Sequence, residues 1–161
     1  SWFYEMVDLG YNYRITDIQC ALGLSQLKKL PSWIKRRQEI AQKYNSAFAE
    51  IPAIQPLGIK ADVFHAYHLY VVRLDLNRLR ATRAEIFAAL RAEGIGVNVH
   101  YIPVHLHPFY QKAFGTRKGL CPIAEEAYER LLSLPIFHGM TDEDVQDVIN
   151  TVTKVLKYYA R

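Results

Sequence analysis

Apolar residues recur at helical spacing in several segments of the chain. The first segment follows Thr16-x-x-Gln19, which has the form of a helix-opening capping box, and residues 17–30 are apolar nearly all round. An apolar helix without a polar face is typical of burial on more than one side. Pro31 predicts a kink or an end, because proline cannot donate the helical hydrogen bond. A second helix is expected over residues 33–48, where apolar residues follow one face.

Four further helices are expected downstream. Thr82-x-x-Glu85 and Thr141-x-x-Asp144 are both capping boxes, and Gly94 predicts the end of the helix that Thr82 opens. Shorter helices are expected over residues 108–114 and from Pro122 to residue 132, because proline suits the first turn of a helix. The final helix carries an unbroken apolar stripe, which predicts that one face is buried: Val145, Val148, Ile149, Val152, Val155, Leu156 and Tyr159.

Strands are expected in three places between these helices. Residues 65–75 alternate and are rich in Tyr and Val, which predicts a strand, and residues 97–103 and 133–137 predict two more. Residues 1–15 are expected to be extended or irregular, and the prolines of residues 51–64 indicate a loop. Helices joined to a small sheet by long connections predict the α+β class.

Composition narrows the class of protein without identifying it. A chain of 161 residues that is 50% hydrophobic can form one domain with a real core. No apolar run approaches the ~20 residues that span a bilayer, so no membrane partner is expected. Cys20 and Cys121 lack C-x-x-C spacing and are expected to be reduced thiols of a cytoplasmic protein.

The net charge of +4 and a pI near 9.0 fit an anionic ligand. Lys28, Lys29 and the run Lys35–Arg37 supply much of this charge, but few aromatic residues lie between them. We therefore interpret the basic run as a solvated helix face, and we expect no nucleic-acid partner.

Asn12 and Arg14 are the most informative candidate site residues. Residues two apart in an extended segment point to the same side, so the amide and the guanidinium can converge on one ligand. The helix that follows presents unpaired N–H groups and a positive dipole end, both of which favour phosphate. The alternative is a turn with a surface arginine and a structural asparagine.

The histidines offer weaker candidates. His100, His105 and His107 could be metal ligands, but no Cys, Asp or Glu lies within six residues of them. We therefore predict no metal site. For His68 the preferred interpretation is a core histidine within a strand.

Four blocks of the chain resemble the DegT/DnrJ/StrS family of sugar aminotransferases. The most specific block is G-Y-N-Y-R-I-T-D-I-Q-C-A-L-G, which starts at Gly10. The others are His68–Arg73, H-Y-I-P-V-H at His100–His105, and Leu134–Phe137. Residues 23–27 and 105–110 most resemble the 4-aminotransferases of the pseudaminic acid pathway.

The resemblance implies a fold and a reaction. Residues 31–161 would form the small C-terminal α+β domain of a fold-type-I enzyme, with long helices packed on a small, mainly antiparallel sheet. Residues 1–30 would be the end of the large-domain segment and a linking helix. Family members use pyridoxal 5'-phosphate to move an amino group from glutamate to a keto-sugar nucleotide. The lysine that forms the Schiff base lies upstream of the Gly10 block in the family, so the 161 residues alone are expected to be inactive and to contain no catalytic residue.

The resemblance also implies roles for individual residues. Asn12 matches the asparagine that reaches the cofactor phosphate of the neighbouring subunit, and Arg14 matches an arginine near the substrate diphosphate. His100 and Tyr101 would line the sugar-nucleotide pocket, with His105 and His107 nearby. The active site would then be shared within a homodimer. The rival hypothesis is a stand-alone, non-catalytic binding or dimerisation module, or a truncated pseudoenzyme.

Overall fold

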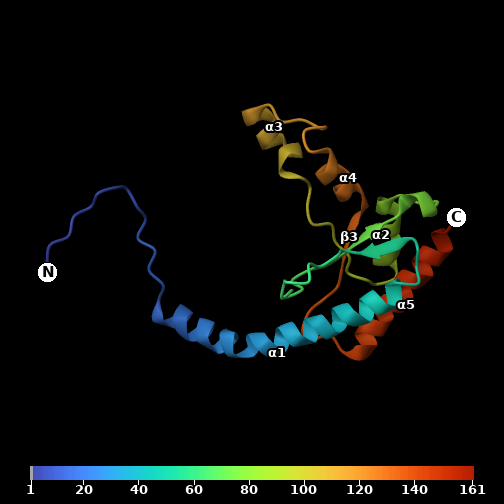
Figure 1. The fold of residues 1–161 in the computed structure, drawn as a ribbon, viewed down its shortest axis with the longest axis horizontal. Helices are drawn as coiled ribbons and strands as arrows, with labels where there is room; N and C mark the ends of the chain where they lie inside the picture. Colours follow the sequence, from blue (N-terminus) through green and yellow to red (C-terminus); the bar gives the residue numbers. More distant parts are fainter. Residues whose placement is uncertain (1) are drawn as a thin grey trace. The chain divides into compact units, whose positions relative to one another are not determined.

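The computed structural model describes residues 2–161, which divide into two compact units, residues 2–32 and residues 33–161. Helix α1, Asp17–Phe48, continues from the first unit into the second. The two units are considered separately, and the labels follow Figure 1.

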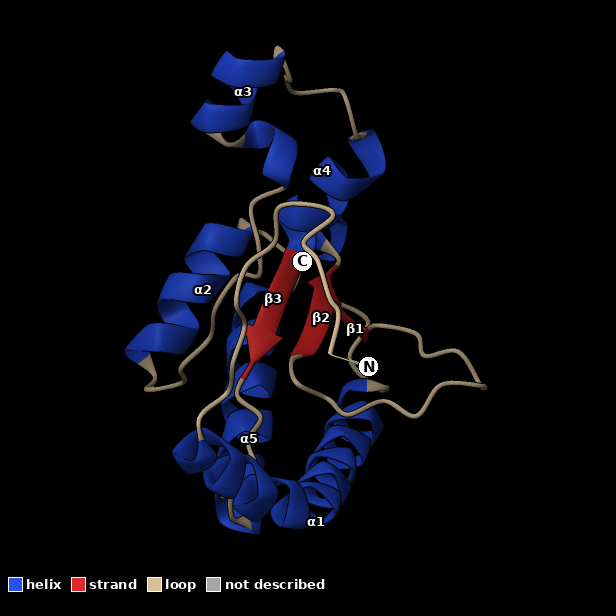
Figure 2. Cartoon of the chain, turned by 90° about the vertical axis from the view of Figure 1, so that its left-hand side faces the viewer, coloured by secondary structure: helices blue, strands red, loops and turns tan. Residues whose placement is uncertain are grey.

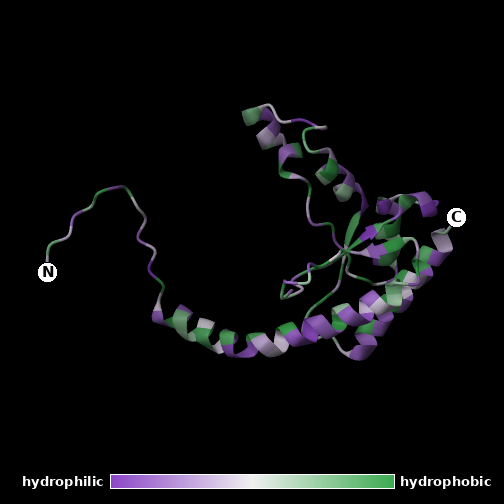
Figure 3. Cartoon of the chain, viewed as in Figure 1, coloured by the Kyte–Doolittle hydropathy of each residue, from purple (hydrophilic) through white to green (hydrophobic). Residues whose placement is uncertain are grey.

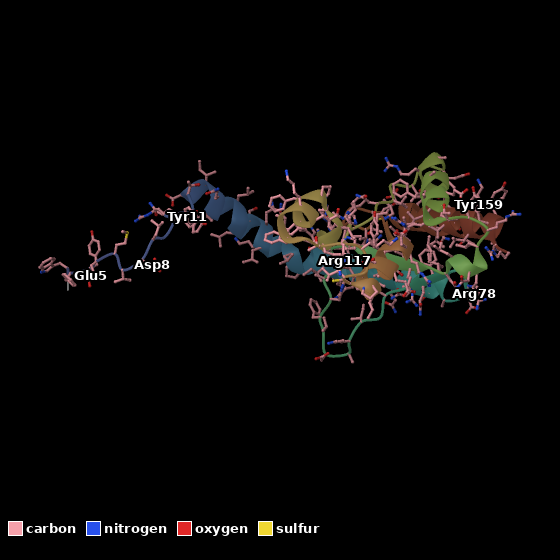
Figure 4. All side chains as sticks on the ribbon, turned by 90° about the horizontal axis from the view of Figure 1, so that it is seen from above. Glu5, Asp8, Tyr11, Arg78, Arg117 and Tyr159 are labelled. Atoms are coloured by element: carbon pink, nitrogen blue, oxygen red, sulfur yellow. The ribbon has the colours of Figure 1, made fainter. Side chains whose placement is uncertain are left out.

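The first unit consists of a segment without helix or strand and the first half of α1. The predicted capping box is confirmed, since the Gln19 N–H donates to Thr16 Oγ1 at 3.3 Å and the Thr16 N–H donates to Gln19 Oε1 at 3.0 Å. Figure 4 shows the side chains of the extended segment, with Tyr11 labelled, standing away from its backbone.

The predicted burial of this half of α1 on more than one face is not found. Green, hydrophobic positions recur along it in Figure 3, yet these side chains are exposed because nothing within this unit packs on them. The exposed apolar residues are Ile18, Leu22, Leu24, Leu27 and Leu30.

Pro31 does not end α1, which runs on to Phe48. The two helices expected on either side of Pro31 are therefore one. Ser32 Oγ donates a hydrogen bond to the Lys29 carbonyl at 2.8 Å, which supplies a bond next to the missing proline N–H.

The second unit is built on a three-stranded antiparallel sheet. Its strands are β1 (Ile54–Pro56), β2 (Tyr70–Leu74) and β3 (Leu131–Leu134), in the order β1-β2-β3. Tyr70 pairs with Leu134 and Gln55 pairs with Arg73 across the two antiparallel ladders. Figure 2 shows this small sheet among the helices. The predicted α+β class with a small, mainly antiparallel sheet is confirmed.

The strand boundaries differ from the prediction for local reasons. Residues 65–69 are not a strand, because Tyr67 adopts a positive φ of 47° and its N–H donates to His65 Nδ1 at 3.0 Å. Residues 97–103 form only one bridge, Asn98 with Ser133, since β3 offers a short edge of four residues. β1 lies within the predicted loop, and β3 begins two residues earlier than expected.

Four further helices complete this unit, together with the short 3-10 turns Leu76–Arg78 and Val104–Leu106. They are α2 (Arg83–Ala92), α3 (Pro108–Phe114), α4 (Pro122–Arg130) and α5 (Asp142–Tyr159). The capping boxes at Thr82 and Thr141 are confirmed, and Gly94 follows α2 with a positive φ of 85°.

One hydrophobic cluster holds the second unit together. Alternate residues of β2 and the apolar stripe of α5 contribute to it, as does the second half of α1. Its most buried large side chains include Tyr44, Phe48, Leu74, Ile86, Leu132 and Leu156. Burial of each such side chain stabilises the fold by about 1.5–3 kcal/mol.

Arg36 and Arg37 are not part of a solvated helix face, contrary to the prediction. Arg37 Nη1 donates to the carbonyls of Tyr67, His68 and Ile136 at 2.9, 3.1 and 3.2 Å. Arg36 Nη2 donates to the Met140 carbonyl at 2.7 Å and to Asp142 Oδ1 at 2.8 Å. These two guanidinium groups connect α1 to backbone carbonyls that lie outside the helices and strands.

Candidate functional site

The side chains of Asn12 and Arg14 contact each other, and their convergence on one ligand stays a prediction. Arg14 Nε donates to Asn12 Oδ1 at 3.0 Å, and the Arg14 N–H donates to the Asn12 carbonyl at 3.2 Å. Both residues are exposed in the segment that precedes α1.

The pair has the donors that a phosphate monoester needs. The Asn12 carboxamide N–H groups and the Arg14 Nη groups make no other hydrogen bond within residues 2–161. An amide beside a planar guanidinium, just ahead of a helix N-terminus, can surround an anion with charge-assisted donors. The phosphate of pyridoxal 5'-phosphate fits the carboxamide donors of Asn12, and the Nη donors of Arg14 suit a second phosphate group.

His100 lies in the second unit, at the edge of the sheet. Its Nδ1 is 2.8 Å from Oγ of Ser133, a buried residue of β3, so the bridge at Asn98 and this hydrogen bond orient the imidazole together. The Tyr101 ring packs edge-on to His100 at 4.6 Å between centroids, and Tyr101 is 75% exposed. An oriented imidazole thus lies beside an accessible phenol.

His105 has a different environment from His100. His105 Nε2 is 2.8 Å from Glu125 Oε1, and both side chains are only 10% exposed. The hydrogen bond from His105, with further bonds from the Gly119 and Cys121 N–H groups, lowers the pKa of the Glu125 carboxyl below its ordinary value. The carboxylate is therefore held in its charged form.

His107 is exposed at the start of α3 and makes no side-chain capping bond there. The structure therefore does not bring the side chains of His105 and His107 into one cluster. His68 is exposed and precedes β2, so the prediction of a core histidine in a strand is wrong. Its carbonyl, rather than its imidazole, has the structural role, because it accepts from Arg37.

Glu125 is the residue that the sequence analysis missed. The only signal was Pro122 at the first turn of α4, which places Glu125 where a carboxylate can accept backbone N–H groups. Its partner lies twenty residues away along the chain, and local spacing does not reveal such a pair.

A pocket of about 330 Å³ lies beside β2, and its lining includes none of the other candidate residues Asn12, Arg14, His100, Tyr101, His105 and His107. Its lining includes Asn45, His65, Tyr67, His68 and Tyr70, with no Lys or Arg. It therefore does not suit a diphosphate. Across residues 2–161, no group of three or more His, Cys, Asp or Glu residues is placed to hold a metal ion. Among the described helices, none combines the length and the apolar character that crossing a membrane requires.

The second unit has the α+β architecture of part of a fold-type-I aminotransferase. The chain matches the DegT/DnrJ/EryC1/StrS aminotransferase family over residues 1–153 and belongs to that family. The family resemblance drawn from the sequence is thereby confirmed.

The chain is similar to several named proteins of this kind. It is 46% identical to the spore coat polysaccharide biosynthesis protein SpsC of Bacillus subtilis, over 98% of the chain and 41% of SpsC. Among solved structures, Helicobacter pylori PseC, an aminotransferase of pseudaminic acid biosynthesis, matches with 32% identity and a TM-score of 0.85, over 99% of the chain and 42% of PseC.

The sugar aminotransferase Spr1654 of Streptococcus pneumoniae, solved in a form with pyridoxal phosphate, matches with 34% identity and a TM-score of 0.84. That match covers 98% of the chain and 40% of Spr1654. The chain therefore spans about two-fifths of the length of each of these relatives.

Proposed function

We propose that the protein to which this chain belongs is a pyridoxal-phosphate-dependent aminotransferase of nucleotide sugars. It moves an amino group from glutamate to C4 of a UDP-linked 4-keto-6-deoxy sugar. The observation that carries the proposal is the exposed Asn12–Arg14 pair, in which Arg14 Nε donates to Asn12 Oδ1 at 3.0 Å, within a chain that matches the family over residues 1–153.

The choice of sugar rests on similarity in two segments. Residues 23–27 and 105–110 resemble the 4-aminotransferases of the pseudaminic acid pathway, and PseC matches nearly the whole chain. SpsC belongs to the synthesis of a polysaccharide, which also calls for modified sugars. The nearest alternative substrate is a GDP-linked keto-sugar of the perosamine type.

The residues of this chain bind and orient in the proposed reaction. Pyridoxal phosphate, when bound, supplies the carbonyl that exchanges amino groups and the ring that withdraws electrons. Asn12 donates from its carboxamide to the cofactor phosphate of the neighbouring subunit, and Arg14 contacts the substrate diphosphate. His100 and Tyr101 line the sugar pocket, and His105 and His107 lie near it.

The proposal has three further parts. The active sites are shared within a homodimer, because Asn12 acts on the cofactor of its partner. The 161 residues alone do not transaminate, since the chain spans only two-fifths of its relatives. The protein works in the cytoplasm, which suits its two free cysteines.

The test is an assay of the full-length protein with glutamate as amino donor and a panel of keto-sugar nucleotides. The panel contains UDP- and GDP-linked sugars with the ketone at C3 or C4. We expect 2-oxoglutarate to form fastest with a UDP-linked 4-keto sugar. If the GDP-linked sugar reacts fastest, the sugar assignment is wrong, and if no sugar reacts and no cofactor absorbance develops, a non-catalytic module is the better description.

A further inference from the structure

Residues 104–125 lie between the bridge residue Asn98 and β3, and they include α3 and the start of α4. Figure 1 shows α3 and α4 together on one side of the sheet. α3 contains no buried residue, so the hydrophobic core does not hold this segment in place.

A polar network closes the segment instead. His105 Nε2 bonds to Glu125 Oε1 at 2.8 Å, and Thr116 Oγ1 donates to the His105 carbonyl at 2.7 Å. Glu125 also accepts from the Gly119 N–H at 2.8 and 3.0 Å and from the Cys121 N–H at 3.3 Å. The carboxylate of Glu125, held by His105, thereby fixes the Gly119–Cys121 end of the loop formed by residues 115–121, which we call the basic loop, and the His105 carbonyl holds its Thr116 end.

The basic loop carries two exposed cations. Arg117, labelled in Figure 4, and Lys118 lie between the anchored residues Thr116 and Gly119. Neither forms an ion pair with any residue in the described range 2–161. Two adjacent cations on an anchored backbone are suited to a diphosphate.

The geometry argues against direct contact between His105 and a substrate. The Nε2 atom of His105 is engaged by Glu125, and the side chain is 10% exposed. Any ligand that took this hydrogen bond would leave a buried carboxylate without its main partner, which is costly.

We infer that His105 and Glu125 are positioning residues that fix the basic loop, so that Arg117 and Lys118 meet the diphosphate of the nucleotide sugar. His105 acts on the site through the loop and does not touch the substrate. This inference rests on the proposed function. The family resemblance places His105 near the sugar pocket but assigns no role to Glu125 or to the bond between them.

The test uses variants of the full-length protein. Glu125→Leu and His105→Leu remove one member of the pair, while His105→Gln keeps an N–H donor of similar reach and serves as the matched control. Arg117→Gln combined with Lys118→Gln removes the cations and leaves the pair intact. Each variant is first checked for an unchanged thermal midpoint, and Glu125→Gln replaces Glu125→Leu if the latter does not fold.

The first measurement is hydrogen exchange of the peptide that covers residues 115–121. Loss of the pair is expected to raise exchange in this peptide about tenfold or more, with the core strands unchanged. His105→Gln is expected to restore most of the protection. Unchanged exchange in the Leu variants overturns the inference, whether or not the protein proves to be an aminotransferase.

The second measurement is the kinetics of amino transfer. The Leu variants and the double loop variant are expected to raise KM for the nucleotide sugar about tenfold with kcat within about twofold of wild type. A fall in kcat for His105→Gln with KM unchanged would show that the imidazole acts on the substrate itself and would overturn the inference. If the wild-type protein reacts with no sugar of the panel and develops no cofactor absorbance, the proposed function is refuted. The exchange measurement alone would then test whether His105 and Glu125 hold the basic loop.

Discussion

The two halves of α1 have similar apolar content but opposite environments. In residues 17–32 the leucines are exposed, with Leu24 and Leu27 each at 62%, whereas Ile40, Ala41 and Tyr44 of the second half are fully buried. The second half packs on the sheet and α5, while nothing within the first unit covers its side chains. Hydrophobicity therefore predicts which residues can be buried, and the presence of a packing partner decides whether they are.

The same contrast applies to charge. Lys28 and Lys29 of the first half are exposed, whereas Arg36 and Arg37 of the second half satisfy backbone carbonyls. The second half of α1 is a structural element of its unit.

The largest expected effect comes from truncating the buried half. Phe48→Ala should destabilise the 161-residue chain by about 3–5 kcal/mol, because it leaves a cavity in a side chain site that is 1% exposed. Leu24→Ala, in the exposed half, should change stability by less than about 0.5 kcal/mol. Urea unfolding of both variants measures the difference, and equal losses would show that the first half has a packing partner within the chain.

Arg37 tests the contrast in charge. Arg37→Met keeps most of the side-chain volume but leaves three carbonyls without their donor, so we expect a loss of about 2–3 kcal/mol. Lys29→Met is the control on the exposed half and should be nearly neutral. Equal unfolding midpoints for the two variants would contradict a structural role for Arg37.

Substitution of Asn12, in the first unit, should affect function without affecting stability, in contrast to substitutions in the second unit. In the full-length protein, Asn12→Ala should weaken retention of pyridoxal phosphate about tenfold, since one donor to its phosphate is lost. The unfolding of the 161-residue chain should not change. Cofactor titration followed by visible absorbance measures the effect, and unchanged affinity would count against this role.

The capping boxes at Thr82 and Thr16 provide a matched pair of smaller effects. Thr82→Ala should cost about 1 kcal/mol, because α2 packs in the core of the second unit and its Glu85 N–H loses the acceptor Thr82 Oγ1. Thr16→Ala removes the same motif from the exposed half and should leave the global unfolding midpoint unchanged, with only local fraying of α1. Circular dichroism during urea unfolding distinguishes the two outcomes.

The smallest expected effect is a pH dependence from Asp142. Hydrogen bonds from Lys43 and then Arg36 lower the pKa of its carboxyl in the folded chain. The unfolded chain therefore binds a proton more readily, so the stability contributed by Asp142 is present above about pH 4 and is lost as the pH falls through the lower folded value. Asp142→Asn should flatten this part of the stability profile, and 0.5 M salt should weaken it. If the stability of Asp142→Asn falls as steeply at acid pH as that of the wild type, other groups cause the dependence.

Local signals in the sequence predict helix starts in both units. The capping boxes at Thr16, Thr82 and Thr141 and the prolines at residues 108 and 122 mark helix starts correctly, because these motifs act over one turn. The proximity of Asn12 to Arg14 also follows from local geometry. The continuity of α1 through Pro31 was not predicted, because proline removes one donor but does not prevent helical geometry beyond it.

Contacts between distant residues were the part that local signals could not show. The single bridge at Asn98 depends on the short edge of β3, and the register of β3 on β2, with Tyr70 opposite Leu134, joins residues far apart in the chain. The His105–Glu125 pair joins residues twenty positions apart, and Arg37 reaches carbonyls thirty and more positions away. Periodicity contains no information about such partners.

The sequence by itself determined the family, the α+β class, most helix starts and the proximity of Asn12 to Arg14, because each depends on motifs or neighbours within a few residues. Only the tertiary structure decided which apolar faces are buried, which arginines satisfy the backbone and which histidine is engaged by a carboxylate. Burial and hydrogen bonding depend on what the fold brings alongside each side chain, and residues far apart in the chain supply those neighbours.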